Sequence, residues 1–201
     1  MPRRIVQLLI GLPLYGAGVA LTVEAGLGVD PWTVLAEGLA LHTGLGVGWV
    51  TNLLGALVLL AWIPLRERPG AGTVLNILVV GTALQLTLDL LPSAESVLAR
   101  IAMLGGGIAL VGLASGLYIG ARFGPGPRDG LMTGLNRRLG WPVWQARAAV
   151  ELTVLALGWL LGGTVGWGTI AFAALIGPAV HVCLRILDTG RREPAAQATI
   201  A

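Results

Sequence analysis

The chain of 201 residues is 55% hydrophobic and only 11% charged, with a mean hydropathy of +0.82. Soluble domains carry about 25% charged residues, so the composition predicts an all-α polytopic membrane protein. The net charge of +3 rests on 13 arginines scattered among apolar runs, and nucleic acid is therefore not an expected partner. The single cysteine, Cys183, excludes an intramolecular disulfide and a multi-cysteine metal site.

Long apolar segments recur along the whole chain. A bilayer core of about 30 Å requires roughly 20 apolar residues in a helix. The first segment follows Arg3 and Arg4 but ends without a clear cleavage site, so we expect it to remain as a membrane span rather than to be removed as a signal peptide. The six predicted spans cover about 5–24, 46–65, 73–91, 98–121, 142–162 and 167–187.

Two helical segments are too short to cross a bilayer. They cover about 31–43 and 129–139, and they follow the turns "GVDPW" and "GPGPR". Each is either a re-entrant half-helix or a helix lying at the membrane interface, with Trp32 as an aromatic anchor in the second case. Pro31 and Pro127 break the chain at the helix starts, where free N–H groups favour a negatively charged group. Pro178 predicts a bend in the last span, as a hinge or as a static kink.

The arginines predict the orientation. With six spans and the N-terminus inside, eleven arginines fall on the inner side and only Arg100 falls outside, while Arg147 lies within a span. Because cytoplasmic loops carry the excess of arginine, we expect both termini to be cytoplasmic in a bacterial inner membrane. Residues 188–201 are polar and small, which predicts a cytoplasmic tail.

An internal repeat emerges when the sequence is shifted by 96 residues and overlaid on itself. Without a gap, 24 of 87 positions are identical, among them Pro31 on Pro127 and Gly28 on Gly124. This register predicts a single membrane domain over 1–187, built from a repeat over about 5–91 and another over about 101–187. Each repeat contains three spans, so the two copies are expected to be inverted relative to each other, and such proteins bind solutes where their broken helices meet.

The two helix breaks supply the first candidate site residues. Arg128 is a candidate for binding an anion, or for pairing with Asp129 or with an acid of the other repeat. Asp129 is placed either to contact a solute or to cap the helix that follows it. Asp30 is expected chiefly to cap its own helix, and Trp32 stands beside it.

Polar groups within the predicted spans supply the other candidates. Arg147 and Glu151 are four residues apart on one helix face, and ionisable groups at membrane depth indicate either function or a structural ion pair. Gln85 and His181 occupy equivalent positions of the two repeats, where an interhelical hydrogen bond is the alternative to solute binding. No catalytic motif is present and the two histidines are far apart, so we expect neither an enzyme nor a bound metal or cofactor.

Three stretches resemble the YczE-like bacterial membrane proteins, which group loosely with the YitT type. They are "GPGPRDGLMTGL", "RAAVELTVLALGWLLGGTVGWGT" and "LIGP", and the resemblance extends over about 5–187. It implies a polytopic bacterial membrane protein, for which transport, including export of small organic molecules, is the usual supposition.

These observations together predict a transporter or channel for a small solute, with an anion as one candidate. Its binding site is expected between the two broken helices. The alternative is a membrane accessory or sensor protein that transports nothing, in which the polar groups would be fully paired and dry. An intramembrane enzyme is a weaker third reading, because it would have only Arg-Asp and Arg-Glu pairs to work with. Expected partners are the lipid bilayer, an unknown small solute and, for a chain this small, a second copy in a homodimer.

Overall fold

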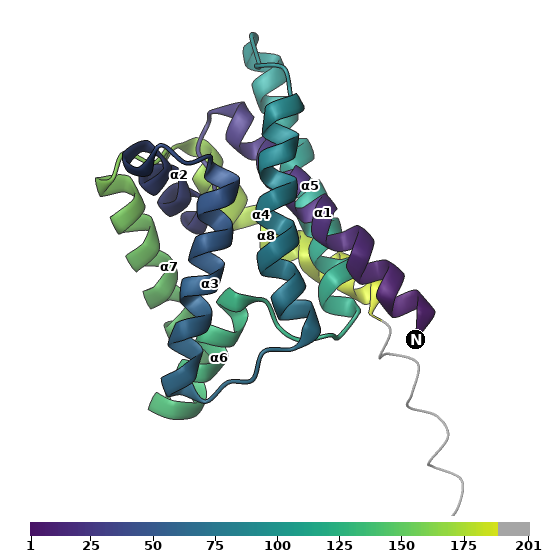
Figure 1. Cartoon of the computed structure of the whole chain (residues 1–201). Helices are drawn as coiled ribbons and strands as arrows, with labels where there is room; N and C mark the ends of the chain where they lie inside the picture. The colour runs from purple at the N-terminus through teal and green to yellow at the C-terminus, as the bar shows by residue number, and fades with distance from the viewer. Residues whose placement is uncertain (189–201) are drawn as a thin grey trace, which may run out of the picture.

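The computed structural model describes residues 1–188, which form eight α-helices. Figure 1 shows how these helices are arranged. The chain is therefore all-α over its described part, as the composition predicted. Of the predicted tail, all but Asp188 lies outside the described residues. The helices are α1 (Pro2–Ala25), α2 (Pro31–Thr43), α3 (Val47–Leu65), α4 (Ala71–Leu90), α5 (Val97–Gly120), α6 (Pro127–Leu139), α7 (Val143–Leu160) and α8 (Trp167–Leu187).

Five of these helices are long and apolar enough to cross a membrane, namely α1, α3, α4, α5 and α8. All six segments predicted as spans are helical, but the fifth of them, α7, is not among these five helices. It has only 18 residues and contains Arg147, Glu151 and Gln145. These polar side chains lower its mean hydropathy, so its length and composition do not by themselves identify it as a span.

The two short helices each contain 13 residues and begin with a proline. Proline suits the first helical position because its missing N–H would have no partner there. α2 covers the predicted residues, whereas α6 begins two residues earlier than expected, at Pro127. Asp129 therefore lies inside the first turn of α6, and the N-cap position belongs to Gly126. The predicted capping role of Asp129 was wrong, because Pro127 can occupy the first turn.

α1 and α5 pack along each other in the middle of the molecule, and α4 and α8 flank them. The backbones approach closely because glycines face each other. A Cβ atom on Gly107 would lie 2.7 Å from the carbonyl oxygen of Gly18, and one on Gly16 would lie 2.3 Å from that of Val80 in α4. Small residues allow such close contacts between helices in a membrane, so these positions hold the central helices together.

The loops that lead into the short helices are fixed against the starts of long helices. The N–H of Gly72 in α4 donates to the carbonyl of Phe123 at 2.9 Å, and the hydroxyl of Thr73 donates to that of Pro125 at 2.7 Å. At α8, the N–H of Gly168 donates to the carbonyl of Leu27 at 2.7 Å. These bonds hold the starts of α2 and α6 beside the central helices.

Candidate functional site

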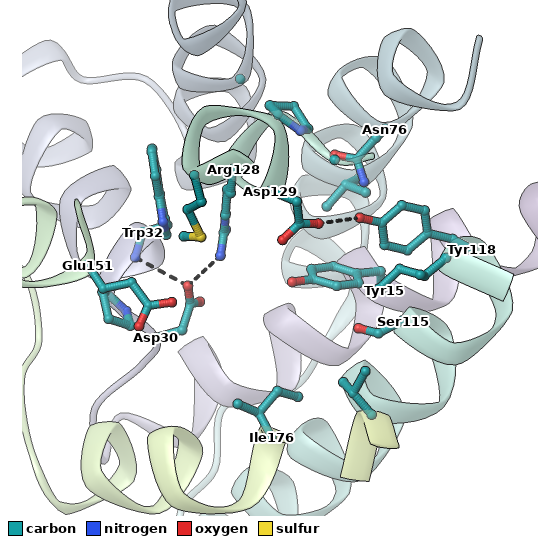
Figure 2. A pocket seen from close by; sticks show the side chains of 18 of the residues that line it. Tyr15, Asp30, Trp32, Asn76, Ser115, Tyr118, Arg128, Asp129, Glu151 and Ile176 are labelled. Atoms are coloured by element: carbon teal, nitrogen blue, oxygen red, sulfur yellow. Dashed lines mark hydrogen bonds and ion pairs between the residues drawn. The ribbon is translucent and has the colours of Figure 1, made fainter. Parts of the chain in front are cut away.

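A cavity of about 600 Å³ lies between the helices, and every one of α1 to α8 contributes residues to its wall. Figure 2 shows its polar side chains on two sides of an open space. The starts of α2 and α6 enter it through Asp30, Pro31, Pro127 and Arg128. The cavity is large enough for a small organic molecule, because ligand pockets typically measure about 300–1,000 Å³.

Asp30 is the most buried charged group of this cavity, with only 3% of its side chain exposed. Its carboxylate accepts hydrogen bonds from the backbone N–H of Trp32 at 3.2 Å and from the hydroxyl of Thr33, so it caps α2 as the sequence predicted. It also accepts from Arg128 at 2.9 Å, across 98 residues of sequence. One carboxylate therefore ties the starts of the two short helices together.

Arg128 lies over the ring of Trp32, with its guanidinium carbon 5.3 Å from the ring centre. Burial lowers the pKa of this guanidinium, but the charge and the hydrogen bond of Asp30 outweigh that effect, and the pKa lies above its ordinary value. The Trp32 ring is 7% exposed, and within the described residues its buried Nε1 has no hydrogen-bond partner. Arg128 thus pairs with an acid of the other half of the chain, which was one of the predicted alternatives.

Asp129 lies on the opposite side of the cavity, as Figure 2 shows. Its Oδ2 accepts a hydrogen bond from the Tyr118 hydroxyl at 3.2 Å, and the carboxylate is exposed to the cavity. Tyr118 in turn contacts Tyr15 edge-on, with ring centres 6.3 Å apart. This side of the site is therefore formed by a carboxylate and two tyrosines.

Arg147 and Glu151 line the cavity from α7 and pair with each other at 3.0 Å. Their side chains are 56% and 33% exposed, so the pair is much more accessible than the pair of Asp30 and Arg128. An accessible pair between adjacent turns contributes about 0.3–0.5 kcal/mol. The pair therefore adds little to stability, and both of its side chains line the cavity.

Other predicted site residues divide between the cavity and the rest of the molecule. His181 lines the cavity from α8. Gln85 does not, because its side chain accepts from the N–H of Gly48 at 3.1 Å and donates to Asp89 at 2.8 Å, at the contact of α3 and α4. Pro178 lies inside α8, which continues to Leu187, and it is not part of the cavity wall.

Sequence reasoning did not find Tyr15, Tyr118 and Ser115, which also line the cavity. One signal was available, since the chain has only two tyrosines and both lie within predicted spans. It also missed Trp62, whose buried Nε1 donates to the carbonyl of Pro127 at 3.1 Å and fixes the start of α6. Among the described residues, no three His, Cys, Asp or Glu side chains form a group that could hold a metal ion.

Comparison with known proteins gives the family. The family of unknown function DUF6198 matches residues 2–185, and the chain belongs to it. An uncharacterized protein of Haemophilus influenzae is 41% identical over 92% of this chain and 85% of its own length. The Bacillus subtilis membrane protein YczE is 36% identical over 83% of this chain and 79% of its own length. The protein YyaS of the same organism is 27% identical over 89% of this chain and 91% of its own length. These matches confirm the resemblance to YczE and identify a multi-pass membrane protein. No solved structure matches the chain significantly.

Proposed function

We propose that this member of the DUF6198 family is a transporter or channel of the bacterial inner membrane, which moves a small solute through the cavity between α2 and α6. The cavity itself carries the proposal, because all eight helices contribute to it and charged side chains face it. Ionisable groups within a membrane protein usually line a solute or ion path. Non-helical backbone at membrane depth is likewise tolerated where it lines a cavity.

In this proposal the chain consists of two inverted repeats of three spans, and α7 is counted as a span in addition to the five helices named above. The offset of 96 residues relates the start of α2 to that of α6, and both helices have 13 residues. The same offset also connects the residues with positive φ. In the described part of the chain, all of these residues fall into four pairs. These pairs are Gly26 with Arg122, Gly28 with Gly124, Gly44 with Gly140, and Arg66 with Gly162.

The hydrogen bonds between the two halves are reciprocal in the same register. Gly72 donates to Phe123, and Gly168 donates to Leu27, so each donor and each acceptor is exchanged for its equivalent. Reciprocal contacts are what a two-fold axis generates. In Figure 1, α2 and α6 lie toward opposite ends of the molecule, which agrees with an inverted arrangement.

One pair of helices departs from this symmetry. α3 packs tightly on α4, where a Cβ atom on Gly81 would lie 2.3 Å from the carbonyl oxygen of Gly48, and Asn52 donates to Thr82 at 3.0 Å. The equivalent pair, α7 and α8, has no comparable packing, and Gly177 has open space where Gly81 is crowded. Inverted-repeat transporters alternate by moving one part against the other around a fixed site. We therefore interpret the closed pair of α3 and α4 and the open pair of α7 and α8 as the two arrangements that exchange in such a cycle.

Cysteine accessibility tests the proposal without knowledge of the solute. In a Cys183→Ser background, Thr51→Cys places a thiol in the cavity wall, and Leu57→Cys places one on the same helix at a residue that is 59% exposed outside the cavity. Each variant is treated with a membrane-impermeant maleimide in intact cells and in inverted vesicles. We expect the Thr51→Cys variant to react from both sides and the Leu57→Cys variant from neither.

The accessory or sensor function predicts a different result. A protein that only binds a partner has no need to open its cavity to both sides of the membrane. Labelling of the Thr51→Cys variant from one side alone would contradict transport and favour this alternative. We further propose that both termini lie in the cytoplasm, as the arginine distribution predicts.

A further inference from the structure

The charged groups in the cavity do not balance. Three carboxylates and two guanidinium groups line it. Arg128 pairs with Asp30 at 2.9 Å and Arg147 pairs with Glu151 at 3.0 Å. Within the described residues, Asp129 has no cationic side chain at ion-pair distance. The cavity therefore contains one carboxylate without an ion-pair partner among the described side chains, and this carboxylate is accessible from the cavity.

Asp129 is placed to receive a ligand. In Figure 2 its carboxylate points into the open space of the cavity, and the Tyr15 hydroxyl points the same way from below it. Only Oδ2 has a partner, the hydroxyl of Tyr118. The other carboxylate oxygen and the Tyr15 hydroxyl are hydrogen-bond acceptors without a donor among the described side chains, and a ligand with N–H groups would supply these donors.

Both helix starts are already provided with negative groups. Asp30 caps α2. At α6, a Cβ atom on the N-cap residue Gly126 would lie 2.6 Å from the Tyr118 hydroxyl and 3.3 Å from Asp129 Oδ2. The space that a capping side chain would take is therefore already filled by these two groups. An anion would have to displace one of these groups or take an arginine from its carboxylate. The cavity is thus better suited to a cation, although free helix starts alone favoured an anion.

The rest of the cavity wall indicates what the cation carries. Tyr15 and Phe172 offer aromatic surfaces, and Ile77, Val80 and Ile176 add aliphatic ones. Aromatic rings attract cations placed over their faces, and the aliphatic side chains suit an apolar group. We propose that the cavity binds an organic ammonium ion with an apolar body, whose charged nitrogen contacts Asp129. That this ion is also the transported solute rests on the function proposed above.

Binding to the purified full-length protein in detergent tests the proposal. Calorimetric titration compares 2-phenylethylammonium with the neutral 2-phenylethanol and the anionic 3-phenylpropanoate, which have similar apolar bodies. We expect the ammonium ion to bind about tenfold more tightly than either of the other two, as a charge-assisted hydrogen bond implies. Stronger binding of the anion or of the alcohol would overturn the proposal, and this comparison needs no variant.

A variant then assigns the binding to Asp129. Asp129→Asn keeps the shape of the side chain and an oxygen for the Tyr118 hydroxyl, and we expect it to raise the Kd of 2-phenylethylammonium about tenfold or more. Asp89→Asn is the matched control, because Asp89 lies outside the cavity wall and should leave the Kd unchanged. An Asp129→Asn protein that binds the ammonium ion as tightly as the wild type would contradict the assignment.

Flux separates this inference from the proposed function. Ammonium binding without uptake into proteoliposomes would leave the binding site standing and remove this ion as the transported solute. A cavity thiol that reacts from both sides, in a protein that does not bind the ammonium ion, would leave transport standing and remove the proposed ligand class.

Discussion

At the scale of single residues, Asp30 illustrates how one side chain combines a local and a long-range task. Its carboxylate caps α2 through the N–H of Trp32, and it also neutralises Arg128 of α6. A buried carboxylate is tolerated only when its hydrogen bonds are satisfied. The cap and the arginine together provide this, so the most buried acid of the cavity is structural as well as part of the candidate site.

Replacing Asp30 separates these contributions. Asp30→Asn keeps an oxygen for capping but leaves Arg128 without its charge partner. Breaking a buried pair in this way costs about 3–5 kcal/mol, and we expect the lower end of that range because the Arg128 side chain is 30% exposed. Arg147→Gln, which breaks a pair whose side chains are 56% and 33% exposed, should cost less than about 1 kcal/mol.

The free energy of unfolding of these variants is measured in mixed micelles by denaturant titration. Equal losses for Asp30→Asn and Arg147→Gln would show that the pair of Asp30 and Arg128 is not a buried interaction.

At the scale of elements, the position of α6 depends on a contact with α3. Trp62 is 1% exposed, and its indole nitrogen donates to the carbonyl of Pro127. The ring lies against Gly130, where a Cβ atom would come within 1.9 Å of it. The absence of a side chain at Gly130 therefore allows the tryptophan to reach the start of α6 and to hold Arg128 and Asp129 in the cavity.

A methyl group at this position tests the contact. Gly130→Ala should destabilise the protein by about 1–3 kcal/mol, because overpacking displaces neighbouring groups. Gly105→Ala is the control, since no atom lies within 4 Å of a Cβ atom there, and alanine in a helix interior should stabilise by up to about 1 kcal/mol. Thermal unfolding followed by tryptophan fluorescence measures both. A Gly130→Ala protein as stable as the wild type would show that Trp62 can move without cost.

At the scale of the whole molecule, the two halves that we propose as repeats differ in one contact between helices. α3 is closed against α4, whereas α7 stands apart from α8. In the proposed register, Glu151 of α7 takes the place of Gly55 of α3, and Arg147 takes the place of Thr51. The charged side chains of α7 resist closure of this helix onto the apolar surface of α8. A solute that interacts with these charged groups would favour the closure.

Filling the space between α7 and α8 should arrest the proposed transport cycle. Gly177→Leu adds a side chain where a Cβ atom meets nothing within 4 Å, so we expect the variant to fold with little change in its thermal unfolding temperature. The leucine would occupy space into which α7 has to move, and the Thr51→Cys thiol should then react from one side of the membrane only. Gly106→Leu, at another open glycine, is the control and should keep two-sided labelling. Two-sided labelling in the Gly177→Leu variant would contradict the proposed closure of α7 onto α8.

The sequence by itself determined the elements of this protein, because they follow from local properties of the chain. Apolar runs gave the helices, and Pro31 and Pro127 marked the starts of α2 and α6. Arg147 and Glu151 were identified as a pair because four residues make one helical turn. The family was recognisable for the same reason, since short stretches of sequence carry it.

Only the tertiary structure decided which of these groups meet. It joined Asp30 to Arg128, gave Asp129 a tyrosine as its partner and placed Gln85 outside the cavity. It also left α7 apart from α8. Such partners lie on different helices, and the order of residues along one helix does not determine how it is rotated against its neighbours. That rotation follows from the packing of small residues between helices, which is a property of the folded chain.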